Sequence, residues 1–222
     1  MNFSIDQVRD ALLFLIALIL SISVHEFGHA WIATKLGDPL PRAQGRLTLS
    51  PARHIDPMGT IVFPLLMYLV HVPLLGWGKP VETNPSNYTR RFSRATGQML
   101  VAVSGPLMNL VMALVVSLAI VAAARLGAIS GDMVFTLLQH LVFLNLTLMF
   151  FNLLPIPPLD GGAVLAWVLP RSQQHIVDFL TRWGFLILLG LVMIPGVMGV
   201  LMYPAMLVSQ KWGMLVLEAS GL

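Results

Sequence analysis

Four long apolar segments constrain what this chain can fold into. Each is long enough to cross a membrane as a helix, which takes about 20 residues, and they cover roughly residues 11–34, 97–124, 133–157 and 183–208. Charged residues make up only 10% of the 222, whereas soluble domains carry roughly 25%. We therefore expect an all-α polytopic membrane protein, with residues 1–222 forming one domain, because helices satisfy their own backbone hydrogen bonds inside a bilayer.

Helix-breaking residues interrupt two of the apolar stretches. The segment 183–208 contains Pro195 and Gly196 near its middle, so it forms either one kinked span or a broken hairpin. A fifth stretch, 58–76, is short and contains two prolines and a histidine. Composition alone leaves open whether this fifth stretch crosses the membrane.

The first apolar segment contains the sequence His-Glu-Phe-Gly-His at residues 25–29. Ionisable side chains are costly at membrane depth and mark function there. Residues four apart share one face of a helix, so His25 and His29 can bind the same metal ion. Glu26 lies beside that face, where a general base accepts a proton from water activated by a metal. The pattern predicts a zinc hydrolase; the alternative, a charged helix surface, gives no reason to expose three ionisable groups to lipid.

A third ligand is needed, because catalytic zinc usually has three protein ligands and one open position. The chain has no cysteine, and all of its ten acidic residues except Glu26 and Asp160 lie near the termini or in loops. Two neutral histidines, Asp160 and a hydroxide make a Zn²⁺ site of zero net charge, which a low-dielectric interior favours. We therefore expect one Zn²⁺ per chain; alternatively, Asp160 caps a short helix that begins at Gly161.

The position of Asp160 predicts the path of the chain through the membrane. His25 lies about 21 Å along the first helix, counted from residue 11 at about 1.5 Å per residue, in one half of the bilayer. To bring Asp160 to the same half, the segment 133–157 must run in the direction of the first helix. Only one net crossing then separates the two helices, and 97–124 supplies it. The stretch 58–76 should therefore re-enter the membrane and return on the same side.

The basic residues predict the orientation, because cytoplasmic loops are enriched in Lys and Arg. With this path, ten basic residues lie on the side of the metal site and three on the other side. The ten are Lys35, Arg42, Arg46, Arg53, Lys79, Arg90, Arg91, Arg94, Arg171 and Arg182; the three are Arg9, Arg125 and Lys211. We expect the active site to face the cytoplasm. The small net charge of +3 reflects this topology and does not indicate a nucleic-acid partner.

A short polar–apolar alternation at residues 46–50, bounded by Gly and Pro, is typical of a strand. We expect a β-hairpin at about 43–57, associated with the membrane, whose edge could bind an extended peptide. The alternative is an ordinary basic loop.

Two asparagines are candidates for stabilising the substrate carbonyl or the oxyanion formed on it. Asn109 follows Gly105 by four residues in the second long segment, so both lie on one helix face. Asn152 lies toward the end of the third. The alternative for Asn109 is polar packing between membrane helices, a common role of asparagine.

Five motifs together resemble the site-2 protease family of intramembrane zinc metalloproteases, over nearly the whole chain. They lie at residues 25–29, 53–60, 76–80, 105–109 and 152–162. The resemblance implies that the protein cleaves the transmembrane segment of a single-span membrane protein. It also implies that Asp160 is the third ligand, that a re-entrant β-sheet lies at about 43–57, and that Asn152 lies near the site. We expect a compact member without the PDZ or CBS domain of many relatives, in a bacterial or archaeal cytoplasmic membrane.

Two other functions would also place ionisable residues at membrane depth. A metal-ion transporter should show several polar sites along a path and often a repeated half, and this chain has no internal repeat. A non-catalytic membrane scaffold would have no need of Glu26 or of all three ligands. The presence of all four residues favours the protease.

Overall fold

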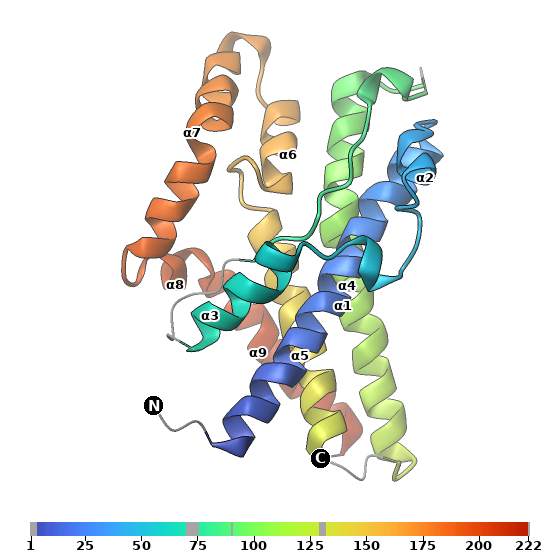
Figure 1. The fold of residues 1–222 in the computed structure, drawn as a ribbon, viewed down its shortest axis with the longest axis vertical. Helices are drawn as coiled ribbons and strands as arrows, with labels where there is room; N and C mark the ends of the chain where they lie inside the picture. Colours follow the sequence, from blue (N-terminus) through green and yellow to red (C-terminus); the bar gives the residue numbers. More distant parts are fainter. Residues whose placement is uncertain (1–3, 70–75, 90, 129–131, 222) are drawn as a thin grey trace.

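Long helices form the body of the protein (Figure 1). The computed structural model describes residues 4–69, 76–89, 91–128 and 132–221. Within these residues, four helices are long and apolar enough to span a membrane. Their bounds are α1 Ile5–Lys35, α4 Arg94–Arg125, α5 Asp132–Asn152 and α7 Gln174–Met193. The prediction of an all-α membrane fold with about four spanning helices is confirmed at this level.

Shorter elements connect or extend these helices. They are α2 Leu40–Ala43, a π-helix Pro57–Val62, α3 Phe63–Leu69, α6 Asp160–Val168, α8 Val197–Leu201 and α9 Tyr203–Ser220, with 3₁₀ turns at Pro51–Arg53, Pro85–Asn87 and Arg171–Gln173.

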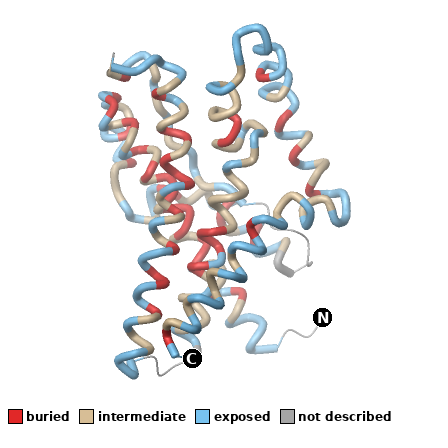
Figure 2. Tube along the Cα trace, turned by 180° about the vertical axis from the view of Figure 1, so that it is seen from behind, coloured by how far each residue is buried: buried red, intermediate tan, exposed pale blue. Residues whose placement is uncertain are grey.

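The helices α1, α4 and α5 pack against one another, and α9 packs on α4 and α5. Figure 2 shows the buried residues concentrated along these helices. Fully buried Ala17 and Ala113 lie in the core of this bundle beside Ile120 and Leu146, and such small residues let helix backbones approach closely. The bundle therefore holds α1, with its His-Glu-Phe-Gly-His sequence, in a fixed position.

The last two predicted spans differ from the observed helices. α5 ends at Asn152 instead of residue 157, because three prolines follow within six residues and cannot continue a helix. α7 begins at Gln174 and ends at Met193, and Gly196 turns the chain with a φ of 84°. The segment 183–208 is therefore broken and is not one kinked span. In Figure 1, α9 continues downward after α7 and α8 and does not fold back as a hairpin.

The predicted strand at 46–50, and the hairpin at about 43–57, are wrong. The structure describes this whole range and contains turns and a 3₁₀ turn but no strand there. The backbone hydrogen bonds of the loop are local: the N–H of Arg46 donates to Pro41 O (2.8 Å) and that of Thr48 to Arg46 O (2.9 Å). The His54 ring donates to Thr48 O (2.7 Å). These groups are thus not available to a neighbouring strand.

The stretch 58–76 returns close to its starting point. It begins within the π-helix and continues as α3, which lies beside the bundle (Figure 1); residues 70–75 lie outside the described part. The N–H of Trp77 donates to Gly59 O (3.1 Å), and the Thr60 hydroxyl donates to Trp77 O (2.8 Å). The two ends of the stretch are therefore adjacent, which fits the re-entrant path. Its depth in a membrane stays a prediction.

Candidate metal centre

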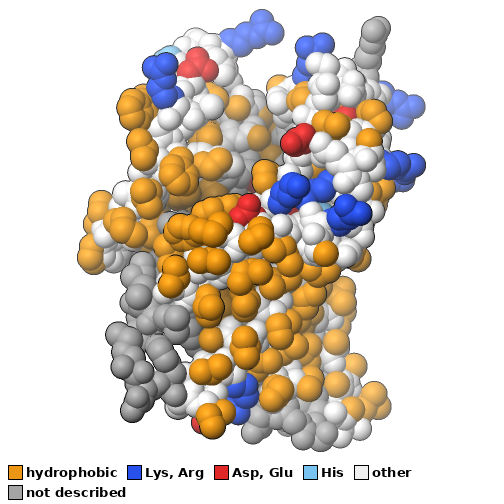
Figure 3. Space-filling model, viewed as in Figure 1, with side chains coloured by type: hydrophobic (Ala, Val, Ile, Leu, Met, Phe, Trp, Pro, Cys, Tyr) orange, Lys and Arg blue, Asp and Glu red, His pale blue; other side chains and the backbone are white. Residues whose placement is uncertain are grey.

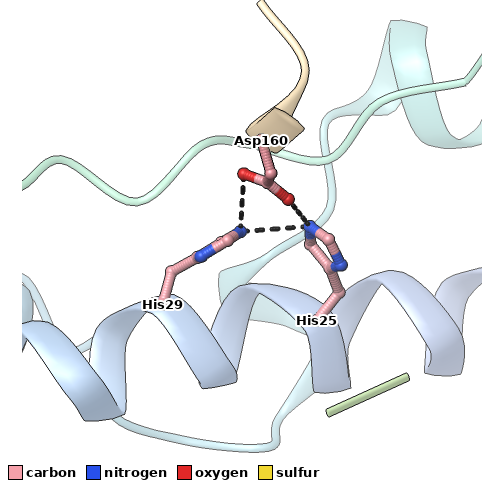
Figure 4. A group of neighbouring side chains, drawn as sticks. All are labelled: His25, His29 and Asp160. Carbon is pink, nitrogen blue, oxygen red and sulfur yellow. Dashed lines mark hydrogen bonds and ion pairs between the residues drawn. The ribbon is translucent and has the colours of Figure 1, made fainter. Parts of the chain in front are cut away.

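His25, His29 and Asp160 meet in one cluster (Figure 4). The two histidines lie one turn apart on α1, and Asp160 is the first residue of α6. His25 Nε2 lies 3.2 Å from Asp160 Oδ2, His29 Nε2 lies 3.4 Å from Asp160 Oδ1, and the two Nε2 atoms are 3.0 Å apart. The three side chains are only 10%, 12% and 17% exposed. The sequence-predicted ligands thus come together although His29 and Asp160 lie 131 positions apart in the sequence.

The hydrogen bonds of the imidazoles leave both Nε2 atoms facing Asp160. His25 Nδ1 donates to Asn109 Oδ1 (2.6 Å), and His29 Nδ1 donates to Val101 O (2.8 Å). Both partners are carbonyl oxygens, which only accept, so a neutral ring carries its proton on Nδ1 and a lone pair on Nε2. Asp160 Oδ2 is buried without a hydrogen-bond donor. Two imidazole lone pairs and a carboxylate that converge in this way match a zinc site.

A buried polar network supports His25 from behind. The Asn109 amide donates to Asn145 Oδ1 (2.8 Å) and Ser21 O (3.2 Å), and the Asn145 amide donates to Ser21 Oγ (2.8 Å). All three residues are fully buried, and they connect α4, α5 and α1. The oxygen and the nitrogen of the Asn109 amide are both engaged, so the geometry favours packing and histidine positioning over an oxyanion role. Asn145 and Ser21 were not among the residues predicted from the sequence, although an asparagine in an apolar segment is itself a signal.

The turn between α5 and α6 orients Asp160. The N-cap of α6 is Leu159, so Asp160 does not cap a helix at Gly161 and its carboxylate faces the histidines. The two glycines that follow allow this turn to pack tightly: a Cβ on Gly162 would lie 2.7 Å from Pro157 Cγ. A Cβ on Gly161 would overlap the carbonyl oxygens of residues 153 and 154. The Asp-Gly-Gly sequence thus fits the steric demand of the site.

Glu26 lies beside the ligand cluster, in the wall of a cavity. The cavity has a volume of about 550 Å³ and contacts all three ligands, Glu26, residues of the extended segment 76–83, and apolar side chains of α1, α4 and α5. Glu26 Oε2 accepts a hydrogen bond from the Val81 N–H (3.0 Å) and lies 3.8 Å from Arg46 Nη2. The contact with Val81 could not be predicted from the sequence, because a backbone N–H has no residue-type signature.

Asn152 also contacts this cavity. Its amide donates to Leu148 O (3.0 Å), and the second N–H of the amide is available for a substrate carbonyl by its chemistry. The oxyanion role of Asn152 stays a prediction.

Gly105 allows α4 to approach the histidines closely. A Cβ at this position would lie 2.5 Å from His29 Nε2 and 2.7 Å from His25 Cε1. Any larger residue would therefore displace the imidazoles, which explains the small residue four positions before Asn109.

Comparison with known proteins identifies the family. A family model described as Peptidase family M50 matches residues 119–191, which include Asp160. YwhC of Bacillus subtilis is 37% identical over 190 residues, 81% of this chain and 80% of that protein. Rip2 of Mycolicibacterium smegmatis is 33% identical over 180 residues, 80% of this chain and 65% of the relative. Rip2 of Mycobacterium tuberculosis is 33% identical over 186 residues, with coverages of 82% and 66%.

The names of these three relatives describe zinc metalloproteases, and no solved structure matches the chain. The metal-ion transporter and the scaffold are accordingly not favoured. The cluster of two histidines and an aspartate lies in a bundle of membrane-spanning helices, and one relative is 37% identical over four fifths of its own length. The chain therefore belongs to peptidase family M50, the site-2 protease family of intramembrane zinc metalloproteases.

Proposed function

We propose that this membrane protease hydrolyses a peptide bond in or next to the transmembrane segment of a single-span membrane protein. One observation carries the proposal. The cluster of His25, His29 and Asp160 opens, beside Glu26, into a cavity inside a bundle of membrane-spanning helices. A substrate that reaches this cavity from the lipid bilayer is itself a membrane protein.

His25, His29 and Asp160, which all line the cavity, would hold one Zn²⁺ per chain. A zinc ion there supplies Lewis acidity, which lowers the pKa of water to about 7 and polarises the scissile carbonyl. Asn109 and the Val101 carbonyl accept hydrogen bonds from the Nδ1–H groups of His25 and His29, respectively, and so keep the Nε2 lone pairs directed at the site. Hydrogen-bond partners of this kind set the orientation and basicity of metal-binding histidines.

Glu26 handles the proton in this proposal. Its carboxylate accepts the proton of the attacking water and then donates it to the amine that leaves. The Val81 N–H holds Oε2, so the carboxylate has a fixed direction before the substrate arrives. Groups that are already oriented lose little entropy when the reaction begins.

The substrate must unwind, because a helix engages its carbonyls in hydrogen bonds. The segment 76–83 supports an extended substrate. The N–H groups of Trp77 and Lys79 donate to the carbonyl oxygens of Gly59 and His54, respectively. The carbonyl oxygens of Trp77 and Lys79 accept hydrogen bonds from the Thr60 hydroxyl and the Arg46 guanidinium. In an extended chain, alternate residues direct their polar groups to opposite edges, so Gly78 offers the other edge to a peptide.

The active site faces the cytoplasm in this proposal, in a bacterial or archaeal membrane. Figure 3 supports it, since most Lys and Arg side chains gather on the upper half of that view, above a broad apolar surface. Basic loops remain on the cytoplasmic side of a membrane.

The proposal is tested by purifying the wild type, Glu26→Gln and Asp160→Asn, and by measuring bound zinc and substrate cleavage. Substrates are found as single-span membrane proteins that accumulate uncut in cells with Glu26→Gln. We expect Glu26→Gln to retain stoichiometric zinc and lose cleavage by about 10²–10⁴-fold. Asp160→Asn should lose both. Cleavage by zinc-loaded Glu26→Gln at the wild-type rate, or wild type without stoichiometric zinc, would refute the mechanism.

A further inference from the structure

Arg46 is a buried arginine with an unusual set of partners. Only 4% of the residue is exposed, whereas arginine is rarely buried unless it is paired. Its guanidinium donates to the backbone carbonyls of Arg53 and Lys79. The same group lies 3.8 Å from Glu26 Oε2. The side chain therefore joins its own loop, the segment 76–83 and helix α1.

These contacts converge on one oxygen of Glu26. Val81, two residues after Lys79, donates its N–H to Glu26 Oε2 (3.0 Å), the oxygen that Arg46 approaches. By holding Lys79 O, Arg46 also holds the backbone that leads to this donor. Within the described residues, Glu26 forms one ion pair, and its partner is Arg46.

The neighbouring histidine does not compete for this role. His54 is fully buried, and its ring donates to Thr48 O (2.7 Å). Burial lowers the pKa of the His54 imidazole, so the ring stays uncharged at neutral pH. The backbone carbonyl of His54 accepts a hydrogen bond from the Lys79 N–H (2.8 Å). His54 therefore holds the N–H of Lys79, while Arg46 holds the carbonyl of the same residue. Arg46 thus supplies the positive charge of this cluster, and a guanidinium is charged at all relevant pH values.

Arg46 does not line the cavity, so it acts on the reaction through Glu26 and not through the substrate. At 3.8 Å the guanidinium attracts the Glu26 carboxylate through its charge. We propose that Arg46 is a positioning residue for hydrolysis: it fixes the Lys79–Val81 backbone and the Glu26 carboxylate as one unit that faces the attacking water. This inference rests on the proposed role of Glu26 as the general base.

Steady-state kinetics of the zinc-loaded full chain test the inference with Arg46→Gln, Arg46→Lys and Arg53→Gln. Arg53→Gln is the matched control, because it removes a positive charge from the same loop at an exposed residue. We expect Arg46→Gln to lower kcat on the order of 10²-fold, the effect of a small misplacement, with KM and bound zinc unchanged. Arg46→Lys should restore part of kcat, since lysine keeps the charge but not the planar set of donors. Arg53→Gln should match the wild type.

A second measurement does not depend on activity. Thermal unfolding of the zinc-loaded wild type, Glu26→Gln, Arg46→Gln and the double variant should give non-additive shifts, because neighbours in one ion-pair network are coupled. Additive shifts, loss of zinc in Arg46→Gln, a raised KM with unchanged kcat, or an equal loss in Arg53→Gln would each overturn the inference.

If Arg46→Gln does not fold, Arg46→Lys tests the proposal instead. We expect a reduced kcat for Arg46→Lys, and a wild-type kcat would contradict the proposal. An inactive Glu26→Gln beside a fully active Arg46→Gln would refute only this inference. An active Glu26→Gln would refute the proposed function itself.

Discussion

At the scale of single residues, the cluster of His25, His29 and Asp160 depends on side chains that lie outside it. Asn109 Oδ1 accepts a hydrogen bond from the Nδ1–H of His25, and the Asn109 amide is itself held by Asn145 and by the backbone of Ser21. A fully buried amide with these partners has one orientation available. The tautomer of His25 is thereby fixed before any metal binds, which is the general function of such outer hydrogen bonds.

Replacing Asn109 should therefore weaken zinc binding. We expect Asn109→Ala to lower zinc affinity about 10–100-fold, the usual cost of losing such a partner, as measured by competition with a chelator. Asn152→Ala is the matched control, because Asn152 contacts the cavity and its amide donates to Leu148 O instead of to His25, His29 or Asp160. Equal zinc affinities for the two variants would show that Asn109 does not position His25.

The meeting of His25, His29 and Asp160 could be predicted from the sequence, but the groups that support this cluster could not. His25 and His29 have helical spacing, and Asp160 is one of very few acidic residues outside termini and loops. Arg46 is one of ten basic residues assigned to the same side, and nothing in its local sequence marks it as buried. The Val81 N–H belongs to the backbone and depends on the path of the chain. Contacts between distant loops are decided by tertiary structure, which local patterns do not encode.

At the scale of elements, the long helices follow from apolar length, and the errors lie where the chain breaks. Length and composition predict where α1 and α4 end to within one residue, although α1 begins six residues and α4 three residues before the predicted start, because a membrane span needs about 20 apolar residues. The alternation at 46–50 misled, because a period of two over five residues is also compatible with a folded loop. In this loop, Thr48 O is taken by the His54 ring.

Gly184, a residue of α7, contacts the turn leading to Asp160. A Cβ on Gly184 would overlap Pro157 O and lie 3.5 Å from Ile156 Cγ2. We expect Gly184→Ala to lower the free energy of unfolding by about 1–3 kcal/mol, the usual cost of overpacking, and to weaken zinc binding by shifting this turn. Thermal unfolding and chelator competition measure both effects.

Gly190→Ala is the control for this prediction. Gly190 lies on the same helix, and a Cβ there meets no atom within 4 Å. The substitution should leave zinc affinity unchanged and should not destabilise the protein, since alanine favours a helix over glycine. If Gly184→Ala behaves like Gly190→Ala, the contact between α7 and the turn has no role in the metal site.

At the scale of the whole molecule, the two ends of the bundle differ in charge. In Figure 1, both termini lie at the lower end, while the α1–α2 junction and the loop between α6 and α7 lie at the upper end. In Figure 3, most Lys and Arg side chains lie in the upper half of the same view. α4 connects the two ends and has 32 residues, a length of about 48 Å at 1.5 Å per residue. This exceeds the bilayer core of about 30 Å.

This arrangement predicts the topology. Reporter fusions at Asn84 and Gly127, which are exposed on either side of α4, should report opposite sides of the membrane, with Asn84 in the cytoplasm. The hydrogen bond between Trp77 N and Gly59 O is consistent with a path in which the stretch 58–76 returns to the side on which it began. A fusion at residue 44, before that stretch, should therefore report the same side as Asn84. Opposite sides for residues 44 and 84 would mean that 58–76 spans the bilayer, and α1 and α5 could then not run in the same direction.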